Sequence, residues 1–294
     1  MAGSTRASRM YEIKRAAIFW KRYCRNRPAV VGLVIVVTVV ALGLLAPVFY
    51  PGDPWSIVAA PFLWPGDPHA PLLGTDVLGR DIASGILHGA RVSLRVGLFS
   101  ALFAGLIGTL VGSVSGYYAG WVDDVLMRIT EAFQTIPSFL TALMIVALFK
   151  PTVTTIIAAI SIVSWPAVAR LVRAEALRVR GSDFVAACLT FGMSDVRIIL
   201  TQVLPNCLAP LIVMVSVMIA SAILIEAGLS FLGLNDPSQL SWGTMIATGR
   251  DALRSAWYMS AIPGVAILVT VLGINLVSDG LNDALNPNLN QRQS

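Results

Sequence analysis

The chain has 294 residues, of which 56% are hydrophobic and only 13% are charged. Soluble domains carry about 25% charged residues, so this composition excludes an ordinary soluble domain and indicates a membrane protein. The net charge is +5, and the basic residues are clustered rather than spread along the chain. We predict an all-α polytopic membrane protein with six transmembrane helices.

Residues 1–28 form a basic N-terminal arm, with eight basic residues against one acid, Glu12. Such a segment can bind nucleic acid, but immediately before a hydrophobic span it more often marks the cytoplasmic side. The apolar run from Ala29 is about 22 residues long, whereas the apolar part of a signal peptide has roughly 7–15. We therefore expect a retained first span over residues 29–49, an arm along the inner membrane surface, and no nucleic-acid partner.

A long excursion over residues 50–91 follows, rich in proline and poor in basic residues, which suits the outer side. Its second half holds the cluster Gly74, Thr75, Asp76, Gly79, Arg80 and Asp81. The glycines can make tight turns, a threonine or aspartate can cap, and Arg80 can pair with Asp76 or Asp81. A catalytic aspartate pair or a cation site is the alternative, but clusters of this kind are usually structural.

Five further spans are predicted from the apolar runs over residues 94–116, 132–149, 154–171, 207–232 and 257–276. The transmembrane region covers residues 29–281, with an inner turn over 117–131 and an inner tail over 282–294. Gly108, Gly112 and Gly116 recur every four residues, which favours close helix contact, either within the chain or with a partner. Pro137, like the prolines at 166, 210 and 263, interrupts a span and could serve as a hinge.

Glu226 is an acid within the fifth span, and an acid at such a position is a candidate functional residue because burying it is costly. The alternative, which we favour, is that it lies near the outer end of its span and pairs with a polar neighbour.

The central segment, residues 174–206, is the longest stretch that is neither a span nor a terminus. Gly181-Ser182-Asp183 should end one helix and cap the next, and Gly192 should end that second helix. Ser194 can cap a third helix, which Pro205 should close. The resulting helix–glycine–helix element has an apolar face that must rest on the membrane domain or on another protein.

No catalytic or nucleotide-binding signature occurs in the sequence, neither a Gly-x-x-x-x-Gly-Lys-Ser/Thr loop nor a His-Glu-x-x-His pair. Cys24, Cys188 and Cys207 fall near the cytoplasmic side, so we expect no disulfide. These cysteines and the two histidines lack metal-ligand spacing, so we expect no metal site. The chain is predicted to be no enzyme, and uphill transport would need energy from a partner.

Several motifs resemble one family of membrane proteins. The run Leu73 to Asp81 closely matches the "LGTDxxGRD" stretch of the C-type permease subunit of dipeptide and oligopeptide importers. The central segment is similar to the "EAA" loop of ATP-binding-cassette (ABC) importer permeases when aligned on Gly192 and Leu204-Pro205. The runs 226–234 and 275–287 match further stretches of this family. The Glu-Ala-Ala slots, however, hold Ala186, Ala187 and Cys188, and Gln202 replaces an aliphatic residue.

This resemblance implies an importer half-pore in a bacterial or archaeal inner membrane, with both termini cytoplasmic. The partners would be a second, usually different, permease, two ATPase subunits that bind ATP and Mg, and an extracytoplasmic binding protein. The central segment would couple to an ATPase through Phe184, Ala186, Ala187, Gly192, Met193, Ser194, Asp195 and Pro205. No cofactor is expected in this chain itself.

The substrate is not encoded in any motif, since permeases of this type import di- and oligopeptides, glutathione, nickel complexes or oligosaccharides. Peptide is the most frequent substrate in the family and is our expectation, with the substrate-binding residues unassigned. A gradient-driven transporter or channel is the alternative of another class, and it would need intramembrane charges along a pathway.

Overall fold

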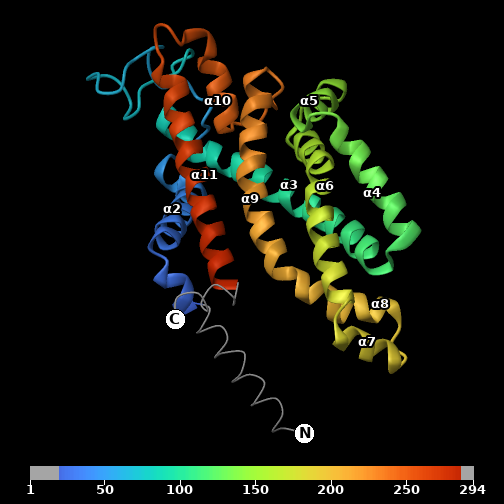
Figure 1. The fold of residues 1–294 in the computed structure, drawn as a ribbon. Coiled ribbons are helices and arrows are strands. Elements are labelled where there is room, and N and C mark those ends of the chain that lie inside the picture. Colours follow the sequence, from blue (N-terminus) through green and yellow to red (C-terminus); the bar gives the residue numbers. More distant parts are fainter. Residues whose placement is uncertain (1–19, 286–294) are drawn as a thin grey trace.

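The computed structural model describes residues 20–285, in which every regular element is a helix. In chain order these are α2 (Arg27–Phe49), α3 (Ile82–Tyr118), α4 (Gly120–Thr135), α5 (Ser138–Leu148), α6 (Val153–Arg180), α7 (Asp183–Thr190), α8 (Asp195–Ile198), the π-helical turn η1 (Ile199–Val203), α9 (Leu204–Phe231), α10 (Trp242–Gly249), the 3-10 turn η2 (Arg250–Ala252) and α11 (Tyr258–Leu285) (Figure 1). The predicted all-α fold is confirmed. Residues 1–19 of the predicted arm and 286–294 of the predicted tail lie outside the described range.

Within residues 20–285, five helical segments are long and apolar enough to cross a membrane: α2, α3, α6, the run from α8 through α9, and α11. A sixth crossing results if α4 and α5, which meet at a bend of 79°, are counted as one broken span. The predicted number of spans is therefore reached only through this bent pair.

The inner turn predicted over residues 117–131 is wrong, because α4 is helical from Gly120 to Thr135. The chain reverses at Ala119 and Gly120 instead, with φ of 53° and 57°. The span predicted over residues 132–149 is interrupted at Pro137, as the sequence indicated, but its first residues belong to α4. Pro137 forces the preceding Ile136 into an extended conformation, so α4 ends there and α5 starts in a new direction. The other three prolines proposed as hinges lie inside the continuous helices α6, α9 and α11.

Helix α3 begins at Ile82, twelve residues before the predicted start of the second span, so the predicted loop over 50–91 is too long. Asp81 starts it, since its Oδ1 accepts a hydrogen bond of 2.8 Å from the backbone N–H of Ala83. With 37 residues, α3 is about 55 Å long at 1.5 Å per residue. Figure 1 shows it running diagonally behind α9 and α6.

The glycines at 108, 112 and 116 pack within the chain, against α6. A Cβ on Gly108 would lie 2.7 Å from the carbonyl oxygen of Trp165, and one on Gly116 would lie 2.6 Å from that of Arg173. Larger side chains would therefore push α3 and α6 apart. Of the two alternatives that the sequence left open, the contact within the chain is the one that these glycines make.

Both ends of the described chain lie at the end of the bundle that carries α7 and α8 (Figure 1). Asn26, which caps α2, donates a hydrogen bond of 2.8 Å from its amide to the carboxylate of Asp283 on α11. The same two helices approach closely at Gly32, where a Cβ would lie 2.7 Å from the carbonyl oxygen of Gly273. The residues between α2 and α3, together with α10, form the opposite end.

Candidate functional site

The segment between α6 and α9 forms a projecting loop built from α7 and α8 (Figure 1). Helix α6 ends at Arg180, Gly181 follows, and α7 begins at Asp183, as predicted. Ser182 and Ser194 hold the N-cap positions of α7 and α8, but neither side chain makes a capping bond. The Ser182 hydroxyl instead donates to the carbonyl of Val179 and ties the loop back to α6.

Gly192 ends α7 with a φ of +71°, in the left-handed region that the prediction required. Two backbone bonds close the helix, from the N–H of Gly192 to the carbonyl of Leu189 (3.0 Å) and from that of Met193 to Cys188 (3.1 Å). This is the Schellman pattern of a helix C-terminus. No atom lies within 4 Å of a Cβ placed on Gly192, so the position requires glycine for its backbone conformation and not for space.

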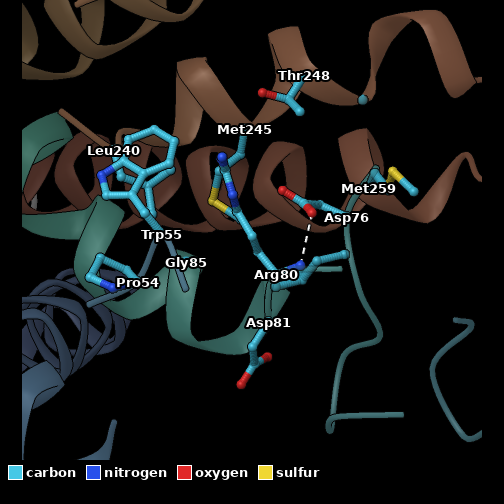
Figure 2. Close-up of a pocket in the computed structure, with 12 residues that line it drawn as sticks. Pro54, Trp55, Asp76, Arg80, Asp81, Gly85, Leu240, Met245, Thr248 and Met259 are labelled. Carbon is cyan, nitrogen blue, oxygen red and sulfur yellow. Dashed lines mark hydrogen bonds between the residues drawn. The ribbon is translucent and has the colours of Figure 1, made fainter. Parts of the chain in front are cut away.

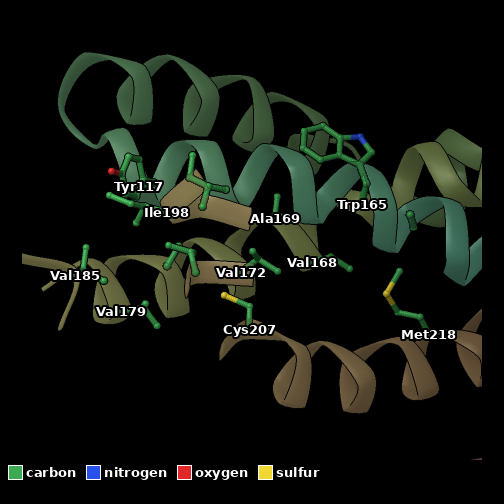
Figure 3. Close-up of a cluster of buried hydrophobic side chains, with 14 of the residues drawn as sticks. Tyr117, Trp165, Val168, Ala169, Val172, Val179, Val185, Ile198, Cys207 and Met218 are labelled. Atoms are coloured by element: carbon green, nitrogen blue, oxygen red, sulfur yellow. The ribbon is translucent and has the colours of Figure 1, made fainter. Parts of the chain in front are cut away.

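One face of the loop is buried against the bundle. Val185 of α7, Ile198 of α8 and Val203 of η1 are fully buried, in contact with a cluster that includes Val172 and Val179 of α6 (Figure 3). The predicted apolar face therefore rests on the membrane domain. These contacts pack the loop tightly against α6.

The opposite face of the loop carries large apolar side chains that no described residue covers. Phe191 is 85% exposed, Phe184 is 45% exposed and Leu189 is 51% exposed. Val196 and Leu200 extend this surface onto α8 and η1. Ala186 and Ala187, which occupy the Glu-Ala slots, are exposed beside them. Large apolar side chains exposed on a projecting loop make it a candidate protein-binding surface.

Tyr117 is a residue of this site that the sequence analysis missed. Its hydroxyl donates a hydrogen bond of 2.7 Å to the carboxylate of Asp195, so the last turn of α3 holds the start of α8. The two residues are 78 positions apart, and no local pattern pairs a tyrosine at the end of a span with an aspartate in a loop.

Pro205 does not close a helix, contrary to the prediction. The chain continues from α8 through η1 into α9, and Pro205 lies in the first turn of α9, where a missing N–H costs little. The wider turn η1 makes this possible, since the N–H of Leu204 bonds to the carbonyl of Ile199, five residues earlier. The loop is thus joined rigidly to α9 on one side and to α6 on the other.

The cluster from Gly74 to Asp81 shapes the connection between α2 and α3. Gly74 and Gly79 both have a φ of +80°, as their predicted turns require. Asp76 accepts backbone bonds from Leu78 (2.8 Å) and Arg80 (2.9 Å). Thr75 is fully buried, and its hydroxyl donates a bond of 2.7 Å to the carbonyl of Ala60. These contacts are those of a structural turn cluster.

Arg80 forms no ion pair with Asp76 or Asp81, so that predicted pairing is wrong. Its guanidinium lies over the ring of Trp55, 4.6 Å from the centroid, and its Nε is buried with no partner among the described residues. Figure 2 shows both residues at a cavity of about 30 Å³, too small for a peptide or a sugar. Burial raises the pKa of Asp81 at this cavity, against the lowering effect of its bonds from the backbone N–H groups of Ala83 and Ser84.

Glu226 is buried in α9 and contacts two hydroxyls. Its Oε1 accepts hydrogen bonds from Ser230 (2.9 Å) and from Ser241 (2.7 Å), the residue that caps α10. The polar neighbours that we expected are thus present. Its Oε2 has no partner among the described residues. Glu226 holds α10 against α9 and takes no part in the loop.

A second residue pair that the sequence analysis missed joins α4 to α6. Both guanidinium nitrogens Nε and Nη2 of Arg173 donate to the carboxylate of Asp123, which also accepts from Ser115 of α3. Asp123 is buried. Beside this ion pair the two helices enclose a polar cleft of about 420 Å³.

Comparison with solved structures defines the class of protein. The fold matches that of the MetNI methionine ABC transporter with a TM-score of 0.58, at 17% identity, over 69% of this chain and 96% of that chain. A second match is an amino acid ABC transporter, with a TM-score of 0.53, at 13% identity, over 68% and 94% of the two chains. The fold is that of an ABC transporter permease.

Sequence relatives define the family. Residues 108–291 match the family described as "Binding-protein-dependent transport system inner membrane component", and residues 15–78 match the "N-terminal TM domain of oligopeptide transport permease C". The chain is 42% identical to the dipeptide transport system permease protein DppC of Escherichia coli K12, over 93% of each chain. It is 40% identical to the di/tripeptide transport system permease protein DppC of Pseudomonas aeruginosa, over 92% of this chain and 91% of that one. The chain belongs to this family of inner-membrane permeases, which confirms the resemblance.

Proposed function

We propose that this chain is a non-catalytic permease subunit of an ATP-driven importer of di- or oligopeptides. The observation that carries the proposal is the level of identity, 40–42% over more than nine-tenths of the chain, to permeases named for dipeptide and di/tripeptide transport. The all-helical fold with its projecting loop supports the transport role.

The proposed partners are those that the permease family implies, and one of them fits a surface that this chain leaves exposed. The exposed apolar face around Phe184 and Phe191 docks into a groove of an ATPase subunit, which binds ATP and Mg. A second permease completes the pathway, as a heterodimer, with two ATPases in the complex. A binding protein delivers the peptide at the end formed by α10 and the residues between α2 and α3.

The charge distribution supports an orientation with the loop in the cytoplasm. Arg173, Arg178, Arg180 and Arg197 lie at the α7–α8 end, whereas the connection between α2 and α3 carries more acids than bases. Cytoplasmic ends of spans are enriched in Lys and Arg. The two ends of the described range, residues 20 and 285, lie at the same end of the bundle as the loop (Figure 1), which supports cytoplasmic termini in the proposed arrangement.

The loop then serves as the coupling element. When the ATPases close on ATP, they displace α7, and the buried contacts of Val185, Ile198 and Val203 pass this displacement to α6 and α9. Rigid-body tilting of the two permeases would alternate the pathway between its inward- and outward-open states.

Reconstitution of the four-component complex into proteoliposomes, with its binding protein outside the vesicles and ATP inside, tests the proposal. We expect accumulation of a radiolabelled dipeptide that requires both ATP and the binding protein. Transport that stops when the ion gradient is collapsed with ATP held constant would favour a gradient-driven carrier instead. If only a sugar-loaded or nickel-loaded binding protein stimulated the ATPase activity, the substrate would be a sugar or a nickel complex and not a peptide.

A further inference from the structure

The cleft between α4 and α6 is lined by charged side chains of both signs. Besides the ion pair of Asp123 and Arg173, its walls carry Asp124, Arg128 and Glu131 on α4 and Arg170 on α6. Its volume of about 420 Å³ falls within the range of roughly 300–1,000 Å³ that is typical of small-molecule sites.

None of these four side chains, Asp124, Arg128, Glu131 and Arg170, makes a hydrogen bond or an ion pair with another residue in the range 20–285. This sets them apart from Arg173, whose Nε and Nη2 both donate to Asp123. The cleft therefore combines one fixed ion pair with two carboxylates and two guanidinium groups that are free to bind something else.

The free charges extend along much of α4. Glu131 is eleven residues from the start of α4, about 16 Å along the helix axis. Unpaired charges in a membrane protein are most favourable where a helix lines an aqueous cavity or a ligand pathway. Helix α4 also exposes the apolar side chains of Trp121, Val125 and Ile129, which lie next to the charged residues on the helix surface and are available to lipid or to a second permease.

The ion pair fixes how the two helices face each other. Arg170 is one helical turn from Arg173 along α6, about 4.5 Å. Because α4 and α6 run in opposite directions (Figure 1), the pairing of Asp123 with Arg173 aligns Arg170 with the second turn of α4, and Arg170 lines the same cleft as Met127 and Arg128. The cleft therefore presents guanidinium groups from both walls, with carboxylates on the α4 wall one turn to either side.

We propose that this cleft is a binding site for a zwitterionic short peptide on its way through the permease. The α-carboxylate of the peptide would bind Arg170 and Arg128, and its α-ammonium would bind Glu131 or Asp124. The free charges sum to zero, as the charges on a peptide backbone do, and the charged ends of an extended dipeptide are about 7 Å apart, within the reach of the cleft. This inference rests on the proposed function, because it takes a peptide as the substrate.

The first test is transport by the complete reconstituted complex with Arg170→Gln or Glu131→Gln in this chain. We expect the rate of dipeptide uptake to fall about tenfold or more, since each change removes the charge that pairs with one end of the peptide. Stimulation of the ATPase by the loaded binding protein should stay within about twofold of wild type, since neither side chain belongs to the exposed apolar face of the loop around Phe184 and Phe191. Arg95→Gln is the matched control, an exposed arginine on α3 outside the cleft, and should transport normally.

The second test locates the peptide directly. A dipeptide with a photoreactive leucine, alanyl-photoleucine, is irradiated with the complex during turnover and the labelled residues are mapped. We expect labelling of residues around Met127 and Arg170 in wild type, and its loss in Arg170→Gln.

Each outcome separates this inference from the proposed function. If wild type does not transport dipeptide at all, the proposed function fails. If wild type transports and both cleft variants match it, or if labelling occurs only elsewhere, the cleft site alone is wrong. Loss of co-purification with the second permease in both variants would assign the cleft to the subunit interface and overturn the inference. A phospholipid that is retained in native mass spectra of wild type and lost from both variants, with transport unchanged, would equally overturn it.

Discussion

Arg91 of α3 donates a hydrogen bond of 2.7 Å from its Nε to the backbone carbonyl of Gly43 in α2. Gly43 lies four residues before Pro47, which is inside the helix and has no N–H to offer that carbonyl. A second bond of 2.8 Å, from Nη2 to the carbonyl of Leu44, makes the contact bidentate. A side chain on the second span thus replaces the backbone donor that proline removes from the first.

Replacement of Arg91 by leucine should lower the free energy of unfolding by about 1.5–3 kcal/mol, because a charged donor is removed from the carbonyl of Gly43, which has no N–H partner within α2. In a Pro47→Ala background, Arg91→Leu should lower the free energy of unfolding by a smaller amount, since the alanine introduced there supplies an N–H to the carbonyl of Gly43. Thermal unfolding of the detergent-solubilised complex measures both, with Arg95→Gln as the neighbouring arginine control. Equal losses in the two backgrounds would show that Arg91 does not act through the carbonyl of Gly43.

Gly192 provides a prediction about coupling. A residue other than glycine at a φ of +71° is strained by roughly 1–2 kcal/mol, and β-branching adds to the strain. We expect Gly192→Val to insert normally in the membrane and to abolish the ATPase activity that the loaded binding protein stimulates. Gly192→Asn should retain most of it, because asparagine tolerates this conformation.

The matched control is Gly181→Ala, at the other end of α7, where φ is −74° and alanine is accommodated. Stimulated ATPase activity at the wild-type level in Gly192→Val would contradict a coupling role for this turn.

The local sequence correctly predicted those features of the fold that neighbouring residues determine. Gly192 was identified because glycine is the residue that ends a helix with positive φ, and Gly74 and Gly79 because tight turns need them. The hydrophobic runs predicted that the long helices exist, but they did not predict the residues at which these helices begin and end. Helix α3 continues past the apolar run to Asp81, because capping and packing determine where a helix stops.

Contacts between distant residues could not be read from the sequence. Asp123 looked like part of a polar turn, and only the fold places it against Arg173, fifty positions away. Arg80 has two acids beside it in sequence, yet Trp55 is its neighbour in space. Pro205 was expected to end a helix because proline lacks an N–H. The chain instead continues through the wider turn η1, and no sequence pattern predicts such a turn.

The two faces of the coupling loop should respond differently to a polar substitution. Phe191→Ser changes a side chain that is 85% exposed, so the isolated chain should keep its stability while binding of the ATPase subunit weakens. Val185→Ser places a hydroxyl in a fully buried position and should destabilise the chain by about 1–3 kcal/mol. Co-purification with the ATPase and thermal unfolding, measured on the same two variants, separate these effects. A Phe191→Ser chain that captures the ATPase as wild type does would exclude this face from the interface.

The contact between Glu226 and Ser241 leads to a final prediction. Ser241 donates to Glu226 and also accepts a bond of 3.0 Å from the backbone N–H of Thr244, so it both caps α10 and joins it to α9. Ser241→Ala removes both bonds and should lower the free energy of unfolding by about 1–3 kcal/mol.

Glu226→Gln retains a carbonyl oxygen for both serine hydroxyls and removes a carboxylate that has no cationic partner among the described residues, so it should be neutral or stabilising. Ser221 is an exposed serine on α9, the helix that carries Glu226, and Ser221→Ala serves as the control for Ser241→Ala. Thermal unfolding of the solubilised complex ranks Ser241→Ala, Glu226→Gln and Ser221→Ala by stability. If Glu226→Gln lost as much stability as Ser241→Ala, the charge of Glu226 itself would be required. If Glu226→Gln instead lost transport with its stability intact, Glu226 would have a role in the transport cycle beyond holding α10 against α9.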